Sequence, residues 1–467
     1  MFKLFREYIS LKVLFLLVTE NLLIWGVLLF ALNLGSYTSL SFFQRGIEGQ
    51  SLLLITFLIG LLCQFCMYYT DLYDLTLVCR RSELMVRLAQ AIGVWCLLMA
   101  VASFFFPKDL LGHNILSLTA VLVLAGICLW REGIGQVGFL FKRFGERVLI
   151  LGTGQIGIDL CRKILTRNDL NLEVAGFLAE EPGRVGERLV NPGIIGTLDN
   201  LVEIVRQEKI NRIVVSLQDR RGRLPVEDLL KLRLQGIVVE DASTLYESVS
   251  GRVPVGCLRP SSLAFSEGFR KFRWQLFLKR CFDLVFTSLG IILSFPLMVL
   301  IAVCIKLDSE GPILFRQERV GQFERVFTLL KFRSMRVGSE PGLPCWATQG
   351  DARITRVGRL LRHFRLDEMP QFFNILRGDM SIVGPRPERP YFVEKLKESI
   401  QYYGERHLVK PGLTGWAQIK FHYSSSEDET REKLEYDFFY IKNFSTLFDL
   451  AIIFQTIKTV LSGEGAR

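Results

Sequence analysis

Leu-Val-Phe-Thr-Ser-Leu-Gly-Ile-Ile-Leu-Ser-Phe-Pro-Leu-Met-Val-Leu-Ile-Ala-Val-Cys-Ile, residues 284–305, decides the fold of the C-terminal part of the chain. The run is long enough to cross about 30 Å of hydrocarbon as a helix. However, basic residues flank it on both sides, among them Lys279 and Arg280. Pro296, near its middle, removes an intrahelical hydrogen bond and bends a helix. We therefore predict a re-entrant helix over residues 281–306 that enters the cytoplasmic leaflet, breaks at Pro296 and returns; a full fifth span is the alternative.

The N-terminal third holds four further apolar runs, each long enough or nearly long enough to cross a bilayer. They cover residues 11–34, 51–69, 84–106 and 114–130. Basic residues gather before the first run, between the second and third, and after the fourth, whereas the other two connections hold only Arg45 and Lys108. By the positive-inside rule, the N-terminus and everything after residue 131 face the cytoplasm. Residues 1–145 are thus predicted to form a four-helix transmembrane bundle that anchors a multi-pass protein.

The composition fits a membrane protein with soluble domains. Of the 467 residues, 50% are hydrophobic, which is too many for an ordinary soluble enzyme, and 22% are charged, which is too many for a purely helical transporter. The net charge of +10 allows nucleic acid, anionic lipid or a phosphorylated substrate as partner. The ten Cys and four His show no spacing typical of a zinc site. Glu20, inside the first span, is either a functional charge or a residue that faces a neighbouring helix.

Residues 146–250 have the pattern of a Rossmann-like α/β domain. A buried-strand pattern at 147–151 leads into Gly152-Thr-Gly154-Gln-Ile-Gly157 and then into a helical pattern. In this context the loop presents the free N–H groups of a helix N-terminus to a phosphate. Two further strands are predicted at 173–178 and 212–216. Two interpretations stay open: a nucleotide or dinucleotide site, or an α/β scaffold in which the glycines serve only the turn.

A Pro- and Gly-containing linker at 251–272 precedes the last domain, 273–467, which carries the candidate chemistry. A run of arginines leads directly into Leu366-Asp367-Glu368-Met-Pro370. Asp367 is expected to cap the helix that follows and to stay ionised beside the cations, which makes it a candidate nucleophile toward an anionic phosphoryl group. Glu368 is the candidate ligand of a Mg²⁺ ion.

The surrounding motifs resemble those of the bacterial sugar transferases, the monotopic polyprenyl-phosphate glycosyl-1-phosphate transferases. They lie at residues 331–335, 366–370, 374–390, 410–418 and 436–449. The resemblance covers about residues 273–467, and the four-span anchor with a Rossmann-like domain resembles the long-form members that initiate exopolysaccharide or O-antigen synthesis. The fold class that follows is a membrane protein with three parts: a four-helix transmembrane bundle, a Rossmann-like cytoplasmic domain and an α+β monotopic catalytic domain.

The resemblance implies a two-step exchange at the inner membrane and, by analogy, a homodimer. Asp367 attacks a UDP-sugar, releases UMP and forms a covalent phosphosugar, which undecaprenyl phosphate then takes up. Glu368 and, as a weaker candidate, Asp437 would hold Mg²⁺. The phosphate-binding candidates are Arg333, Arg362, Arg365 and Arg386. The residues that match the family's motif at the start of the membrane helix are Lys279, Arg280 and Asp283.

The chain departs from the family pattern at the helix break, where many relatives carry Ser-Pro and this sequence has Phe295-Pro296, with Ser294 one step earlier. Two rival functions remain. One is a membrane-anchored NAD-dependent nucleotide-sugar epimerase or dehydratase that uses the glycine loop with Tyr391 and Lys395. The other is a non-catalytic assembly or sensor protein. The transferase interpretation gives the basic residues a lipid surface and two diphosphates to bind, so nucleic acid is no longer needed as a partner.

Overall fold

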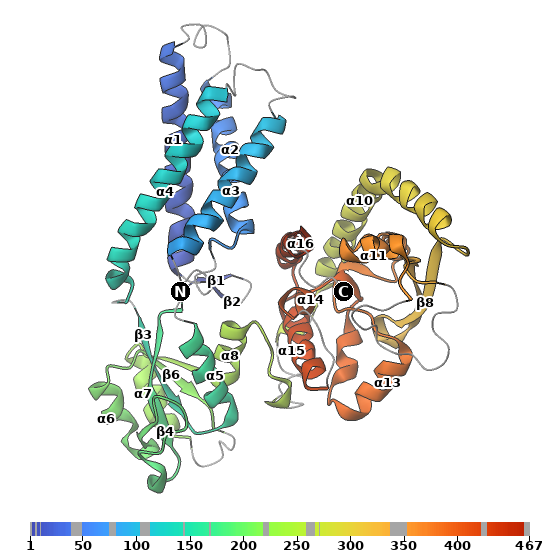
Figure 1. Ribbon diagram of the computed structural model, residues 1–467. Coiled ribbons are helices and arrows are strands. Elements are labelled where there is room, and N and C mark those ends of the chain that lie inside the picture. Colours follow the sequence, from blue (N-terminus) through green and yellow to red (C-terminus); the bar gives the residue numbers. More distant parts are fainter. Residues whose placement is uncertain are drawn as a thin grey trace. The chain divides into compact units, whose positions relative to one another are not determined.

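The computed structural model describes most of the chain (Figure 1). The described residues are 2–4, 7–9, 11–38, 49–73, 81–102, 113–142, 145–167, 170–217, 224–257, 267–269, 271–336, 353–421 and 427–461. Residues 258–266 and 270 of the predicted linker, and residues 39–48 and 107–112 of the expected external loops, lie outside these ranges. The chain divides into two compact units, Met1–Leu245 and Tyr246–Arg467.

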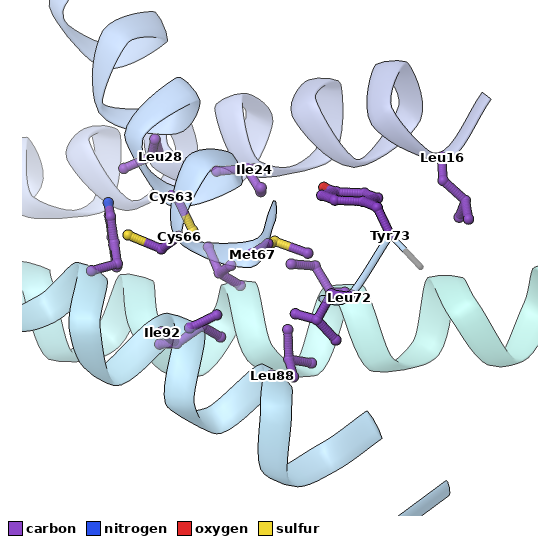
Figure 2. Close-up of a cluster of buried hydrophobic side chains, with 14 of the residues drawn as sticks. Leu16, Ile24, Leu28, Cys63, Cys66, Met67, Leu72, Tyr73, Leu88 and Ile92 are labelled. Atoms are coloured by element: carbon purple, nitrogen blue, oxygen red, sulfur yellow. The ribbon is translucent and has the colours of Figure 1, made fainter. Parts of the chain in front are cut away.

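Four long helices follow a short N-terminal hairpin of β1 (Phe2–Leu4) and β2 (Glu7–Ile9). The helices are α1 (Leu11–Thr38), α2 (Gly49–Tyr69), α3 (Arg81–Ala102) and α4 (His113–Lys142). They share one apolar core, in which Ile24, Met67 and Leu88 are fully buried (Figure 2). By length and composition, three helical segments among the described residues could cross a membrane: Val13–Ala31, Ser82–Ala102 and Arg273–Asp308. That α2 and α4 also cross the membrane stays a prediction.

Glu20 has a charged partner inside this bundle. The Arg131 guanidinium, near the middle of α4, donates from Nε to Glu20 Oε1 at 2.7 Å and from Nη2 to Oε2 at 3.2 Å. Its Nη1 donates to the carbonyl of Leu72 at 2.9 Å, and its Cζ lies 5.6 Å from the centroid of the Tyr73 ring. The Glu20 side chain is fully buried. The structure therefore favours the interpretation of Glu20 as a residue that faces a neighbouring helix and ties α1 to α4.

Glu20→Gln should destabilise the bundle, because it leaves the Arg131 guanidinium buried without a counter-charge. Breaking a buried ion pair on one side costs about 3–5 kcal/mol, so the variant should melt at a clearly lower temperature in detergent. Glu83→Gln is the matched control, since the Glu83–Arg87 pair on α3 is an i,i+4 pair with a half-exposed carboxylate. Such pairs contribute only about 0.3–0.5 kcal/mol. Equal melting shifts for the two variants would contradict the structural role of Glu20.

The rest of the first unit is a five-stranded parallel sheet with helices around it (Figure 1). The strands are β3 (Glu146–Leu151), β4 (Leu172–Ala179), β5 (Ile194–Thr197), β6 (Arg212–Val215) and β7 (Val238–Asp241). Its helices are α5 (Gln155–Thr166), α6 (Leu201–Gln207) and α7 (Val226–Leu234), and α8 (Ala242–Ser250) runs across the boundary to the second unit. The spatial order β5-β4-β3-β6-β7 places the first strand of the domain at a topological switch point beside the fourth, as in doubly wound nucleotide-binding folds. The predicted Rossmann-like domain is confirmed at the level of fold, although the sequence did not indicate the short strands β5 and β7.

The second unit is an α+β domain built on one long apolar helix, α10 (Arg273–Asp308). Its strands form two separate pairs: the antiparallel hairpin of β8 (Leu314–Val320) and β9 (Val326–Phe332), and the parallel pair of β10 (Ser381–Val383) and β11 (Gly412–Thr414). The helices that pack around them are α11 (Arg356–His363), α12 (Gln371–Arg377), α13 (Pro390–Ser399), α14 (Trp416–Lys420), α15 (Glu427–Asn443) and α16 (Thr446–Leu461).

The first residues of the predicted linker are packed on this domain. Trp416 Nε1 donates to the carbonyl of Gly251 at 2.9 Å, and the Val253 N–H donates to the carbonyl of Glu435 at 3.1 Å. The Arg252 guanidinium is almost fully buried and pairs with Glu432. The expectation that the whole segment 251–272 is a linker is therefore wrong at its start, because residues 251–253 make specific contacts with α14 and α15.

Buried polar contacts tie the first limb of α10 to the domain. Lys279 Nζ donates to Asp449 Oδ2 at 2.7 Å, and both residues are buried. Asp283 Oδ1 accepts hydrogen bonds from Ser381 Oγ at 3.0 Å and from the Ile382 N–H at 3.1 Å. These charged side chains near the start of an apolar helix therefore hold the helix to the domain.

Arg280 belongs to the same anchor. Its guanidinium donates to the carbonyls of Ile375 and Leu376 at 2.7 and 2.8 Å, in the last turn of α12. The last carbonyls of a helix have no partner within it, so the partly buried Arg280 guanidinium satisfies two of them. The three residues of the predicted motif thus bind three different parts of the domain.

The second limb of α10 packs on the same domain. Met298, Ile301 and Ile305 form one cluster with Phe332 and Leu361. The helix is continuous through Pro296, and Figure 1 shows that its ribbon changes direction partway along. Since both limbs contact one domain, the structure supports the predicted re-entrant path, which stays a prediction because no membrane is present.

Close to Pro296, a side chain donates a hydrogen bond to the helix backbone, although this sequence lacks the Ser-Pro of many relatives. Ser294 Oγ donates to the carbonyl of Gly290 at 2.6 Å, one turn earlier in the helix. Hydroxyls that bond back to the preceding turn in this way often accompany a bend. The serine one residue earlier thus supplies the contact that the sequence left in doubt.

Candidate active site

Asp367 and Glu368 lie in a short 3-10 turn, Leu366–Glu368, between α11 and α12. The turn follows Arg365, whose φ of 53° is in the left-handed region that residues other than glycine rarely adopt. Pro370, and not Asp367, directly precedes the first residue of α12. The expectation that Asp367 caps this helix is therefore wrong, because a separate turn intervenes. Both carboxylates are buried, each residue being 8% exposed.

Two cations hold the Glu368 carboxylate. Its Oε1 accepts from Lys331 Nζ at 3.0 Å and from Arg386 Nη2 at 2.9 Å. Burial alone would raise the pKa of Glu368, but the charges of Lys331, Arg386 and Arg365 outweigh it and hold the pKa well below its usual range. The surrounding cations therefore favour the ionised form of Glu368.

Asp367 is in a different state from its neighbour. Burial, with the negative charge of Glu368, raises the pKa of Asp367, while Lys331, Arg362 and Arg386 act against this rise. This corrects the expectation that the cations around Asp367 simply favour its ionised form. None of the described residues donates a hydrogen bond to its carboxylate. A buried carboxylate with cations nearby and no donor among the described residues is suited to attack an anionic phosphoryl group.

The four predicted phosphate-binding arginines divide into two groups. Arg386 contacts Glu368 directly and its side chain is 36% exposed, so it can also reach a ligand. Arg362 Nε donates to Ser334 Oγ at 2.9 Å and acts electrostatically on Asp367, and Arg365 acts in the same way on Glu368. These three residues lie near the carboxylate pair, and their binding of phosphate stays a prediction.

Arg333 has another role. It is 5% exposed, and its guanidinium donates to the carbonyls of Glu310 and Ser309 at 2.7 Å, at the end of α10. It also donates to Ser309 Oγ at 2.9 Å. The predicted phosphate contact of Arg333 does not fit this geometry, because both terminal nitrogens are used in closing the C-terminus of the membrane helix.

Lys331 is the site residue that the sequence reasoning did not single out. It is the residue before last of β9 and contacts Glu368, 37 positions further along the chain. The sequence feature that could have identified Lys331 is its place in the 331–335 motif. A lysine on a half-buried strand is otherwise an ordinary solvent-facing residue.

The segment that carries Arg386 is fixed by glycine packing and buried charge. A Cβ on Gly412 would lie 2.1 Å from the Gly384 nitrogen, and one on Gly415 would lie 2.2 Å from the Gly384 carbonyl oxygen. Only glycine allows the two backbones to approach this closely. Arg406 Nη2 donates to the carbonyl of Arg386 at 3.0 Å. The position of Arg386 therefore depends on contacts between the 384–387 and 410–418 motifs.

Asp437, the second predicted metal ligand, is paired with this scaffold. Its carboxylate lies 2.8 Å from Arg406 Nη2, and both side chains are almost fully buried. Among the residues that the structure describes, no group of three or more His, Cys, Asp and Glu side chains could hold a metal ion. Mg²⁺ needs only one or two carboxylates when substrate phosphates supply further oxygens. Both predicted ligands contact cations in the structure, Glu368 with Lys331 and Arg386 and Asp437 with Arg406, and binding of Mg²⁺ by either carboxylate stays a prediction.

The glycine loop of the first unit has the geometry of a strand–turn–helix. Gly152 has a φ of +93° at the end of β3, and Gly154 directly precedes α5. A Cβ on Gly157 would lie 2.7 Å from Ser216 Oγ, so this glycine lets α5 approach the end of β6. Gly152 thus allows the turn, and Gly157 allows the close helix–strand packing. Whether the loop also binds a nucleotide or serves only the scaffold stays open.

The fold and the site together define a membrane-associated α+β domain with a buried carboxylate pair among cations. Comparison with known families agrees with this description. The family model for bacterial sugar transferase matches residues 274–463, and the model for a CoA-binding domain matches residues 68–231. The Tyr391 and Lys395 pair of the rival epimerase interpretation lies inside the first match.

Curated relatives give the same result. The UDP-N-acetylgalactosamine-undecaprenyl-phosphate N-acetylgalactosaminephosphotransferase of Aeromonas hydrophila is 44% identical over 239 residues, 51% of this chain and 56% of that protein. The undecaprenyl-phosphate glucose phosphotransferase of Komagataeibacter xylinus is 34% identical over 70% of this chain and 61% of that protein. The UDP-glucose:undecaprenyl-phosphate glucose-1-phosphate transferase of Klebsiella pneumoniae is 34% identical over 72% of each chain.

The chain belongs to the bacterial sugar transferase family. The match spans about six-tenths of the length of the first two of these relatives.

Proposed function

We propose that this protein transfers a sugar 1-phosphate from a UDP-sugar to undecaprenyl phosphate at the bacterial inner membrane. The products are UMP and an undecaprenyl-diphosphate sugar, the lipid-linked unit that starts an exopolysaccharide or O-antigen. The observation that carries the proposal is the pair of adjacent, buried carboxylates, of which Glu368 is bound by Lys331 and Arg386 and Asp367 has no hydrogen-bond donor among the described residues. The names of the relatives, all undecaprenyl-phosphate sugar phosphotransferases, support it.

The reaction proceeds in two displacements at one phosphorus atom. In the first, a carboxylate oxygen of Asp367 forms a bond to the β-phosphorus of the UDP-sugar, and the bond to the bridging oxygen breaks with UMP leaving. In the second, a phosphate oxygen of undecaprenyl phosphate attacks the same phosphorus, and the Asp367 carboxylate leaves. Arg386 and Arg362 stabilise the phosphoryl charge, since arginine makes bidentate contacts to phosphate.

Glu368 and the donor's own diphosphate would hold a Mg²⁺ ion. When bound, the ion neutralises charge on the diphosphate and so favours attack by an anion. Lys331 and Arg386 contact Glu368 Oε1 and fix the orientation of the carboxylate. With Asp437 bound to Arg406, Glu368 is the protein carboxylate proposed for the ion.

The sugar is proposed to be a hexose. The relatives include both glucose and N-acetylgalactosamine transferases, so an N-acetylated sugar is the alternative. A panel of UDP-sugars tests both, with purified protein in lipid nanodiscs, undecaprenyl phosphate and Mg²⁺, and with release of UMP as the readout.

Asp367→Asn should reduce UMP release by at least about a thousandfold, because an amide cannot form the covalent bond to phosphorus. The same variant should yield no phosphosugar-protein adduct by intact mass spectrometry. Asp428→Asn, which removes an exposed carboxylate of α15, is the control and should behave like the wild type. Full turnover by Asp367→Asn would refute the assignment of the nucleophile.

The pH profile of UMP release should show an acid limb set by Asp367. Since burial raises the pKa of this group and only its ionised form attacks, the rate should fall as pH decreases through a midpoint above the ordinary value of 3.8. Lys331→Met removes a charge that lowers this pKa, so its midpoint should move to higher pH. Lys395→Met, at an exposed lysine of α13, should leave the midpoint in place. A downward shift in Lys331→Met would be inconsistent with this electrostatic arrangement.

EDTA should abolish UMP release, and added Mg²⁺ should restore it. Glu368→Gln should require a higher Mg²⁺ concentration for half-maximal rate, because it removes the proposed protein ligand. Asp437→Asn should not change that concentration, whatever its effect on stability. Turnover that persists in EDTA would exclude the metal from the mechanism.

A further inference from the structure

The segment that carries Arg386 is held through its carbonyl groups. Pro385 and Pro387 flank the arginine, and because proline has no backbone N–H, the segment has few donors of its own. The four consecutive carbonyls of residues 385–388 each accept a hydrogen bond from outside the segment, at 2.9 or 3.0 Å. Their donors are, in order, the Gly412 N–H, the Arg406 guanidinium, the Arg319 guanidinium and the Val320 N–H. Two of the four contacts therefore come from the end of β8.

Arg319, the donor to the carbonyl of Pro387, needs a counter-charge to stay in place. Its side chain is 18% exposed. Burial lowers the pKa of Arg319 to about 10, and the positive charges of Arg386 and Arg389 act in the same direction. A mostly buried cation beside like charges is tolerated only with an anionic partner. Glu388 is in that position, since its Oε2 lies 3.6 Å from Arg319 Nη1.

Glu388 also connects this segment to α15. Lys433 of that helix donates from Nζ to Glu388 Oε1 at 3.0 Å, so each carboxylate oxygen faces a different cation. Burial would raise the pKa of Glu388, but the charges of Lys433, Arg406 and Arg319 outweigh it and lower the pKa to about 2. Loss of this negative charge would leave Lys433 and Arg319 mostly buried without it, and would weaken the contact of Arg319 with the carbonyl beside Arg386.

We propose that Glu388 is a positioning residue for the transfer reaction: through Arg319 and Lys433 it holds the backbone of residues 386–388, so that the Arg386 guanidinium stays at Glu368 and meets the phosphoryl group. The inference rests on the proposed function and adds to it the carboxylate on which the position of Arg386 depends. Glu388 acts on the reaction through Arg386 and does not touch the substrate. A purely structural ion pair is the competing interpretation.

The first test compares Glu388→Gln with Glu247→Gln. Glu247, on α8, is a matched control because it also pairs with a lysine of α15, Lys442, at 2.7 Å, and the two side chains are 13% and 17% exposed. The Lys433–Glu388 pair is similarly buried, with side chains 15% and 21% exposed. The two pairs differ in that only Glu388 belongs to the segment that carries Arg386.

Glu388→Gln should lower the kcat for UMP release about tenfold and leave the KM for the UDP-sugar within about twofold, because Arg386 acts on charge in the transfer step. Glu388→Asp keeps the charge and should recover part of the rate. Glu247→Gln should keep both constants within about twofold of the wild type. Equal kcat values for the two glutamine variants would overturn the proposal.

A double-mutant cycle with Arg386→Ala separates positioning from structure. If Glu388 acts through Arg386, adding Glu388→Gln to Arg386→Ala should change kcat by less than about twofold, since the group being positioned is already gone. A further loss as large as in the single variant would show that Glu388 acts independently of Arg386 and would refute the proposal. Arg319→Gln removes the same support from its other side and should give the same results, so it takes the place of Glu388→Gln if that variant does not fold.

Hydrogen exchange gives a readout that does not need turnover. The amides of Val320 and Gly412 are bound to carbonyls of this segment. In Glu388→Gln they should exchange at least about fivefold faster than in the wild type in nanodiscs, because the segment that accepts their hydrogen bonds is loosened. Glu247→Gln should leave these amides unchanged. Wild-type exchange at both amides in Glu388→Gln would count against the proposal even if kcat falls.

The proposed function and the role of Glu388 fail in different ways. If the function is wrong, the wild type releases no UMP from any UDP-sugar, while hydrogen exchange still reports whether Glu388 holds the segment. If only the role of Glu388 is wrong, the wild type turns over, and Glu388→Gln has the same kcat and the same exchange as Glu247→Gln.

Discussion

The ion pairs of Glu368 with Lys331 and Arg386 are the interaction on which the site depends. A buried carboxylate is tolerated only when cations compensate it. Lys331 reaches Glu368 from the β8–β9 hairpin and Arg386 reaches it from the segment after β10. Two parts of the domain that do not share a sheet are thus joined through a single oxygen atom. The two adjacent carboxylates therefore differ in their surroundings. Glu368 makes the direct cation contacts, and Asp367 has no hydrogen-bond donor among the described residues.

The same principle operates at the membrane helix. Apolar side chains alone would not fix the direction of α10. Its polar contacts with the rest of the domain do fix it. Lys279 pairs with Asp449, and Arg280 and Arg333 each bind backbone carbonyls at the end of a helix. Both limbs of the helix are thus tied to one domain, and the re-entrant path stays a prediction.

Buried charges in the molecule are of two kinds: ion pairs that join segments of the fold, and the carboxylate pair of the candidate active site. Glu20 and Arg131 compensate each other and join two helices of the bundle. Asp437 and Arg406 also compensate each other, and Arg406 in addition holds the backbone of Arg386. At Asp367 and Glu368, two adjacent carboxylates lie among Lys331, Arg362 and Arg386, the cations proposed to receive an anionic ligand.

Some of this could be predicted from the sequence because it is local. The apolar runs, the proline within one of them, the strand–glycine–helix pattern at 147–165 and the Asp367-Glu368 pair in its motif are all properties of short segments, and the structure has a helix or strand at each of the first three. Arg333 and Asp437 have partners in the structure that the sequence did not indicate, because a sequence shows that a charge is present and not which group it meets. Their partners, like those of Lys279 and Lys331, lie from 23 to 170 residues away. The sequence by itself determined where hydrophobic and chemical groups stand along the chain, and only the tertiary structure decided which charges compensate each other, since that depends on contacts between distant segments.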